Sequence, residues 1–307
     1  MYTFRKLTEA LIPDVYIVFK SASKKNISID KFRKKYNTLY TTEYAIGFLA
    51  YDSNNHPVAF FCVIPCYIFY NNKKYLVAQA VDAVTNPKHM RKGLFSKLVQ
   101  LTTDLAQEIG VEFIFGTPNE LSFPPFINKL GWDHNGYMYK IQKKVFTIPF
   151  GNISTLHPFF KKIHAKYVRA ILYFYKKTNS INVVQDTSKM CIDRSNNFIS
   201  YKNYTEKYLV CFNTNTYWIS INGNMKVGDG FIKNEKYLQN DLKKLKRLAF
   251  LVGSKKVVFQ VNQNHPLMNL FKPIIATIQG LPIIYFNISK KLDPHQLCLT
   301  YADIDTF

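Results

Sequence analysis

The spacing of apolar residues in the amino-terminal third predicts one strand, two helices and then three long strands. Apolar residues recur every three or four positions in the helical stretches and alternate or run continuously in the strands. In chain order, the predicted elements are a strand at 2–6, helices at 9–21 and 28–36, and strands at 44–51, 58–70 and 74–84. Polar loops of the hairpin type separate the last three strands, so we expect an antiparallel meander.

The following stretch, Gln79–Trp132, changes its hydrophobic period and predicts a β-α-β-α unit. Its strand breaks at Pro87, and a basic turn then leads into an amphipathic helix. A short apolar strand at 113–116 follows, and a last helix is closed by Gly131.

The turn before the first helix of this unit has the features of an anion site. Gly93 allows the backbone to approach a ligand, and the amides of residues 93–96 open the helix without partners inside it. Arg91 and Lys92 add positive charge, so a pyrophosphate would be attracted there. The same residues also fit an ordinary surface loop, and the order of the neighbouring motifs is what favours the anion site.

That order resembles the GNAT (GCN5-related) N-acetyltransferases. The matching features are the strand end at Val84, the Arg91–Ser96 turn, Asn119 after the next strand and the Leu130–Trp132 ending. The resemblance implies acetyl-CoA, or another acyl-CoA, as co-substrate and the pyrophosphate over the turn. The cofactor-binding residues that it implies are Val84, Thr85, Arg91, Lys92, Gly93, Leu94, Phe95, Ser96 and Asn119.

Three positions depart from the family pattern. Met90 replaces the usual Arg or Gln, Phe95 replaces a small residue, and Ile127 stands where many members carry a general-acid tyrosine. Pyrophosphate binding should survive because it depends mainly on backbone amides. The variant motif looks like that of a bacterial subgroup in surface-polysaccharide and amino-sugar pathways, which implies an amino-sugar acceptor.

The second half of the chain repeats the order of elements and predicts a degenerate GNAT-like half. The predicted elements are strands at 208–212, 217–221 and 225–227, a helix at 237–251, and strands at 256–261, 282–288 and 299–303. Asn262 follows a strand of the second half as Asn119 does in the first half. At the position of the basic turn, however, the second half has an acidic turn, Gly228–Gly230, which would repel phosphate. We therefore expect one cofactor site.

The expected fold class is α/β (α+β), a GNAT-like mixed sheet flanked by helices, with two GNAT-like domains in tandem. Composition shifts after residue 145, where prolines and a glycine indicate a linker, so we expect a linker and helix at 146–179 between two domains. The resemblance implies that 1–145 is a GNAT acetyltransferase domain and that 180–307 is the degenerate domain. The linker helix, 159–176, carries an aromatic stripe and clustered lysines. It fits an interdomain packing helix, which we favour, or a helix on a membrane surface or nucleic acid.

Net charge and cysteine content indicate the possible partners of the protein and the redox state of its thiols. The net charge of +21 fits either scattered surface lysines or a functional basic groove for an anionic partner. The five cysteines lie mostly in apolar runs and complete no ligand set, so we expect reduced thiols in a cytoplasmic protein and no metal. No membrane span and no signal core are predicted.

The leading functional hypothesis is a direct, acyl-CoA dependent N-acyltransferase acting on a primary amine, with a nucleotide-linked amino sugar as one candidate acceptor. The catalytic candidates are Asp82 and Glu120 as base and Tyr137, Tyr139 or His134 as proton relay. Strand alternation would put Asp82 and Val84 on one face and Val81 and Ala83 on the other. The alternative is a non-catalytic GNAT-like protein that uses its basic surface for nucleic acid or membrane; we expect no nucleic-acid partner.

Overall fold

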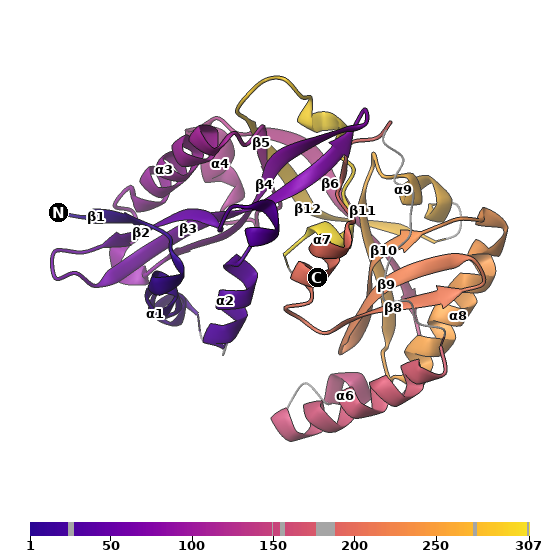
Figure 1. Cartoon of the computed structure of the whole chain (residues 1–307). Coiled ribbons are helices and arrows are strands. Elements are labelled where there is room, and N and C mark those ends of the chain that lie inside the picture. Colours follow the sequence, from indigo (N-terminus) through magenta and orange to yellow (C-terminus); the bar gives the residue numbers. More distant parts are fainter. Residues whose placement is uncertain (24–27, 149, 154–156, 176–187, 273–274, 306) are drawn as a thin grey trace. The chain divides into compact units, whose positions relative to one another are not determined.

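The computed structural model describes residues 1–23, 28–148, 150–153, 157–175, 188–272, 275–305 and 307 (Figure 1). The chain forms two compact units, each assembled from three segments. Unit 1 comprises Met1–Gly136, Asp186–Tyr204 and Pro282–Leu297, and unit 2 comprises Tyr137–Gln185, Thr205–Leu281 and Cys298–Phe307. The expected boundaries at 145 and 180 treat each domain as continuous in sequence, whereas both units take segments from distant parts of the chain.

Unit 1 is built on a mixed sheet. Its strands are β1 (Thr3–Lys6), β2 (Ile46–Tyr51), β3 (Pro57–Tyr70), β4 (Lys73–Thr85), β5 (Phe113–Gly116) and the part of β12 (Thr277–Asn287) that begins at Pro282, in that order. The first four pair antiparallel, which confirms the predicted meander, and β5 lies parallel to β4. Residues 284–287 of β12 pair antiparallel with β5, and short β7 (Cys191–Ile192) pairs with β3.

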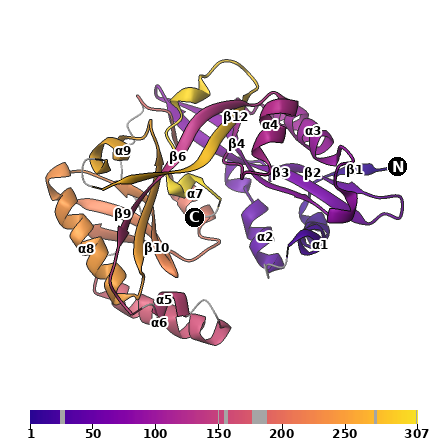
Figure 2. The same cartoon turned by 180° about the vertical axis from the view of Figure 1, so that it is seen from behind.

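Helices cover both faces of this sheet (Figures 1 and 2). After a 3₁₀ turn at Glu9–Leu11, α1 (Ile12–Ala22) and α2 (Ile29–Tyr36) pack on one face, and α3 (Leu94–Ile109) and α4 (Phe123–Leu130) on the other. Because successive strand residues point to opposite faces, Phe60 joins the α1–α2 core and Phe61 the α3–α4 core. A returning segment adds α7 (Asn196–Lys202) beside α2.

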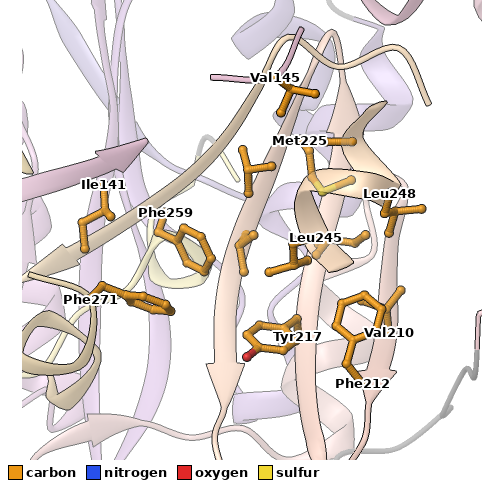
Figure 3. Close-up of a cluster of buried hydrophobic side chains, with 14 of the residues drawn as sticks. Ile141, Val145, Val210, Phe212, Tyr217, Met225, Leu245, Leu248, Phe259 and Phe271 are labelled. Carbon is orange, nitrogen blue, oxygen red and sulfur yellow. The ribbon is translucent and has the colours of Figure 1, made fainter. Parts of the chain in front are cut away.

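Unit 2 has its own sheet and core. Its strands run β6 (Asp133–Lys144), β11 (Lys256–Asn262), β10 (Asn224–Phe231), β9 (Asn215–Asn222) and β8 (Lys207–Phe212). Its helices are α5 (Phe150–Ile153), α6 (Pro158–Tyr173), α8 (Leu238–Leu251) and α9 (Pro266–Phe271). Leu245 and Leu248 of α8 pack onto the strands beside Tyr217 and Phe259 (Figure 3).

Two sequence predictions in unit 2 are wrong. Gly228–Gly230 is not a turn, because β10 continues through these residues: Gly228 is the extra residue of a bulge, and Asp229 and Gly230 pair with β9. A Cβ at Gly228 would lie 2.2 Å from the Phe307 ring, so close ring packing rather than a turn requires this glycine. The predicted strand at 299–303 is a single bridge from Thr300 to Val261 followed by a 3₁₀ turn at Tyr301–Asp303.

Candidate active site

Strands β4 and β5 separate halfway along β4. They pair only from Ala78 to Ala80, opposite Ile114–Gly116, whereas β3 stays paired with β4 as far as Thr85. Residues 81–85 therefore keep a backbone edge that β5 does not cover, and such an edge can pair with an extended ligand. At the point of separation a Cβ on Gly116 would lie 3.2 Å from that of Ala80, so the strands are close there.

A β-bulge at this point changes the faces of the β4 side chains. The register shifts between Cys62 and Val63, so Val81 is an extra residue on β4. Val81 and Val84 both pack on the α1–α2 core, while Ala83 is exposed. The predicted simple alternation, with Val81 on the face of Ala83, is wrong because a bulge adds one residue to the two-residue period.

Asp82 is held by the end of α2. Its Oδ2 accepts hydrogen bonds from Lys35 Nζ at 2.6 Å and from the Tyr36 hydroxyl at 2.7 Å. The Asp82 side chain is 14% exposed and that of Lys35 is 9% exposed, so the charges compensate each other where water is scarce. Asp82 thus lies on the face of the sheet that α1 and α2 cover, and Lys35 is the oppositely charged partner that a carboxylate in such a position requires.

The basic turn has the geometry that an anion site needs. Arg91 and Gly93 adopt left-handed backbone with φ of 61° and 75°, and α3 starts at Leu94. A Cβ at Gly93 would meet nothing within 4 Å, so the space above it is open. The first amides of a helix lack intrahelical partners, and no bond from the amides of residues 94–96 to another described residue is found. The turn fits a phosphate-bearing ligand.

Two of the three departures from the family pattern, Phe95 and Ile127, are residues that pack in the α3–α4 core. Phe95 points into the α3–α4 core, where its ring meets Phe61 edge-on at 6.2 Å and Phe126 at 5.1 Å. A large residue is accommodated because its bulk lies under the turn. Ile127 packs against the same core.

The remaining candidates have different surroundings. Asn119 Oδ1 accepts from the amides of Leu121 and Ser122, both at 3.0 Å, and so shapes the turn before α4. Glu120 is exposed, and so is His134, whose ring meets Phe123 edge-on. Tyr137 belongs to unit 2, as does Tyr139.

A cavity of about 590 Å³ lies in unit 1 between α2 and α7. Its lining combines one cation with amides, a hydroxyl and tyrosines: Lys34, Asn37, Tyr40, Asn197, Ser200, Tyr201, Asn203 and Tyr204. Tyr40 and Tyr201 stack with centroids 4.9 Å apart. The Tyr201 hydroxyl donates to the Lys35 carbonyl at 2.7 Å. Burial raises the pKa of both phenols well above the usual range, so they stay protonated and act as donors.

Sequence reasoning missed Lys35, Tyr36 and the α7 segment. The spacing of Phe32, Lys35 and Tyr36 puts all three on one face of α2, so a lysine on the apolar face was a usable signal. No sequence pattern indicated that Tyr201 would return to α2.

Comparison with known proteins identifies the type of domain. Residues 3–135 match the family model described as an acetyltransferase (GNAT) domain. No curated protein sequence matches the chain significantly.

Solved structures share the fold over nearly the whole chain. A GCN5-related N-acetyltransferase from Kribbella flavida superposes with a TM-score of 0.60 at 10% identity, over 94% of this chain and 72% of that one. A putative acetyltransferase from Pyrococcus horikoshii gives 0.55 at 14% identity, over 99% and 94%. The N-myristoyltransferase of Saccharomyces cerevisiae, solved with myristoyl-CoA, gives 0.57 at 9% identity, over 93% and 79%.

Residues 3–135 therefore match a GNAT acetyltransferase domain, and the fold is a GNAT-like mixed sheet flanked by helices. In the described part of the chain, no helix is long and apolar enough to cross a membrane. Among the same residues, no group of three His, Cys, Asp or Glu side chains is placed to hold a metal ion.

Proposed function

We propose that the protein is an acyl-CoA dependent N-acetyltransferase acting on a primary amine. The observation that carries the proposal is the open edge of β4 at residues 81–85 directly before the glycine turn and the start of α3. An extended thiol arm can pair with the edge while its pyrophosphate reaches the helix amides.

The glycine turn and the β4 edge would hold the cofactor mainly through their backbone amides. The open space over Gly93 accommodates the pyrophosphate, and the exposed Arg91 and Lys92 add charge. When bound, acetyl-CoA supplies the activated acyl thioester. Amides of the β4 edge near Val84 and Thr85 would donate to the thioester oxygen and stabilise the negative charge that develops there. Asn119 shapes the turn after β5.

The proposed chemistry needs a base for the amine, since an alkyl ammonium has a pKa of ~10. Asp82 is our first candidate because its carboxylate lies next to the open edge and is fixed by Lys35 and Tyr36. The carboxylate takes a proton from the ammonium, directly or through one water. The amine nitrogen then bonds to the acyl carbon, the carbon–sulfur bond breaks, and the proton that the nitrogen loses on forming the amide is taken up by the departing thiolate. Glu120 and Tyr137 remain candidates for base and proton relay.

The α2–α7 cavity is our candidate for the non-reacting part of the acceptor. Asn and Ser groups suit hydroxyls, tyrosine faces suit a sugar ring, and Lys34 suits a phosphate. The lining contains no carboxylate, which disfavours polyamines. Tyr201 and Lys35 connect this cavity to Asp82. A nucleotide-linked amino sugar has the required chemistry.

The test is release of CoA thiol from acetyl-CoA in the presence of amines. We expect turnover with a nucleotide-linked amino sugar and little with a polyamine such as spermidine. Lys34→Ala should raise KM for the sugar and leave KM for acetyl-CoA unchanged, whereas Lys20→Ala, an exposed lysine on α1, should change neither. Turnover confined to polyamines would contradict the proposed acceptor. Absence of turnover with every amine would contradict the proposed N-acetyltransferase activity.

A further inference from the structure

Helix α6 presents three different faces. Its packed face carries Val168 and Leu172, which are buried in the unit 2 core. His164 Nε2 lies 2.8 Å from the Val252 carbonyl, and the Tyr167 hydroxyl donates to Leu251 O at 2.8 Å. These contacts fix α6 at the carboxy-terminal end of α8 (Figure 2). The other two faces point away from this core, and Tyr167 lies at the border between the packed face and the apolar exposed face.

The second face of α6 is apolar and exposed. Phe159, Ile163, Tyr167 and Phe174 follow one another at helical spacing and are 61%, 50%, 43% and 83% exposed. The sequence favours a packing helix here, and α6 does pack on the unit 2 core, through Val168, Leu172 and the partly buried Ile171. The rest of the predicted aromatic stripe stays exposed.

The exposed apolar surface continues beyond α6. Phe146, Ile148 and Phe150 are 99%, 63% and 54% exposed. The Thr147 hydroxyl bonds to Phe250 O at 2.9 Å, so this segment lies at the same end of α8 as α6. Nine of the seventeen large hydrophobic residues exposed in the described chain fall between residues 146 and 174. Apolar residues concentrated in this way indicate a binding surface, not chance exposure.

The third face is basic and flanks the apolar stripe. Lys162, Lys166 and Arg169 lie at helical spacing and are exposed. Arg169 pairs with Glu206 at 3.0 Å. The sequence from His134 to Gln185 contains no Asp or Glu, although the whole chain has 20 of them. An anionic partner would therefore meet little repulsion.

We propose that the apolar and basic faces of α6, together with Phe146, Ile148 and Phe150, bind the surface of an anionic phospholipid bilayer. A helix lying in a bilayer interface needs exposed aromatic residues that enter the acyl boundary and flanking lysines that meet lipid phosphates. A second copy of this chain would bring two basic faces together, and nucleic acid would leave Phe146 and Phe174 in water. The bilayer satisfies both faces at once.

Vesicle co-sedimentation of the full chain tests this surface. The protein should pellet with phosphatidylcholine vesicles that contain phosphatidylglycerol and stay in solution with phosphatidylcholine alone. Phe159→Ser with Ile163→Ser should lower binding roughly tenfold, because binding scales with the apolar area inserted. Ile278→Ser with Leu281→Ser is the matched control, since these residues are 47% and 38% exposed elsewhere in unit 2 and should have no effect.

Charge is tested separately. Lys162→Glu with Lys166→Glu should also lower binding roughly tenfold, whereas Lys236→Glu with Lys243→Glu should have a smaller effect. Unchanged melting temperatures would show that each variant folds. The proposal would be overturned if the Phe159→Ser, Ile163→Ser variant pelleted as much as the Ile278→Ser, Leu281→Ser control. It would also be overturned if the wild type did not pellet with the anionic vesicles. A wild-type dimer that Phe159→Ser dissociates, or retention on RNA without vesicle binding, would overturn it as well.

Discussion

At the residue scale, the proposed base Asp82 has a carboxylate whose two hydrogen-bond partners are consecutive residues of α2. Lys35 and Tyr36 both donate to Asp82 Oδ2, and the carbonyl of Lys35 accepts from Tyr201. Such a network can orient Asp82 for proton transfer or can serve stability alone. The two roles can be distinguished by substituting Asp82, because only the catalytic role predicts a large loss of turnover with acetyl-CoA affinity unchanged.

Asp82→Asn keeps the shape and removes the basicity. If Asp82 is the base, turnover should fall by roughly 10²–10⁴ with affinity for acetyl-CoA unchanged. Tyr36→Phe is the matched control, because it removes one hydrogen bond to the same oxygen and leaves the carboxylate. It should keep the rate within about tenfold. An Asp82→Asn enzyme with its original rate and pH profile would move the role to Glu120 or to water.

The buried phenols predict a loss of stability in alkali. The pKa of Tyr201 in the folded state is raised by burial above its ordinary value of 10.0. Unfolding then favours ionisation, so the stabilisation is complete below pH 10 and is lost as pH rises through the folded-state pKa. Chemical unfolding between pH 9 and pH 11 should show this fall, and Tyr201→Phe should flatten it. An identical slope in that variant would contradict the assignment.

At the scale of elements, α3 begins at the proposed cofactor turn and also packs in the core. Its first residues follow directly after Gly93 of the turn, while Phe95 and Leu98 pack the helix onto the sheet. The hydrophobic period predicted α3 and most strands well, because each buries one regular face. The hydrophobic period could not predict the bulges at Val81 of β4 and Gly228 of β10, since both depend on the neighbouring strand.

Phe95→Ala tests whether this departure from the family pattern is structural. Removing a ring that packs against Phe61 and Phe126 should lower the free energy of unfolding by about 3 kcal/mol, the lower end for Phe→Ala changes because Phe95 is only half-buried. Affinity for acetyl-CoA should change little, since the amide stays in place. Met90→Ala, an exposed neighbour, should leave stability unchanged. A variant of full stability with weakened acetyl-CoA binding would show that the ring contacts the ligand instead.

At the scale of the whole molecule, each unit depends on segments that are distant in sequence. Unit 1 takes β12 from residues near the end of the chain and α7 from its middle. The sequence predicted the strand at 282–288 but assigned it to the second half, because periodicity identifies an element and not its partner strand. The α2–α7 cavity escaped prediction for the same reason.

Truncation after residue 145 should therefore give an insoluble or unfolded protein. Such a chain lacks β12, so β5 loses the strand that pairs with residues 113–116 and buried Ile284 leaves the core. Expression and circular dichroism of the truncated chain beside the full chain would measure this. A soluble truncated protein with full activity would mean that neither β12 nor α7 is needed for the site.

The central claim is one CoA site at the glycine turn of unit 1, and calorimetric titration with acetyl-CoA tests it most directly. We predict one site per chain, no binding to Gly93→Asp, whose carboxylate would occupy the open space over the turn, and a loss of about 1–2 kcal/mol for Arg91→Ala. Unchanged melting temperatures would exclude unfolding of the variants. Two equal sites per chain, no binding to the wild type, or full binding to Gly93→Asp would contradict the account.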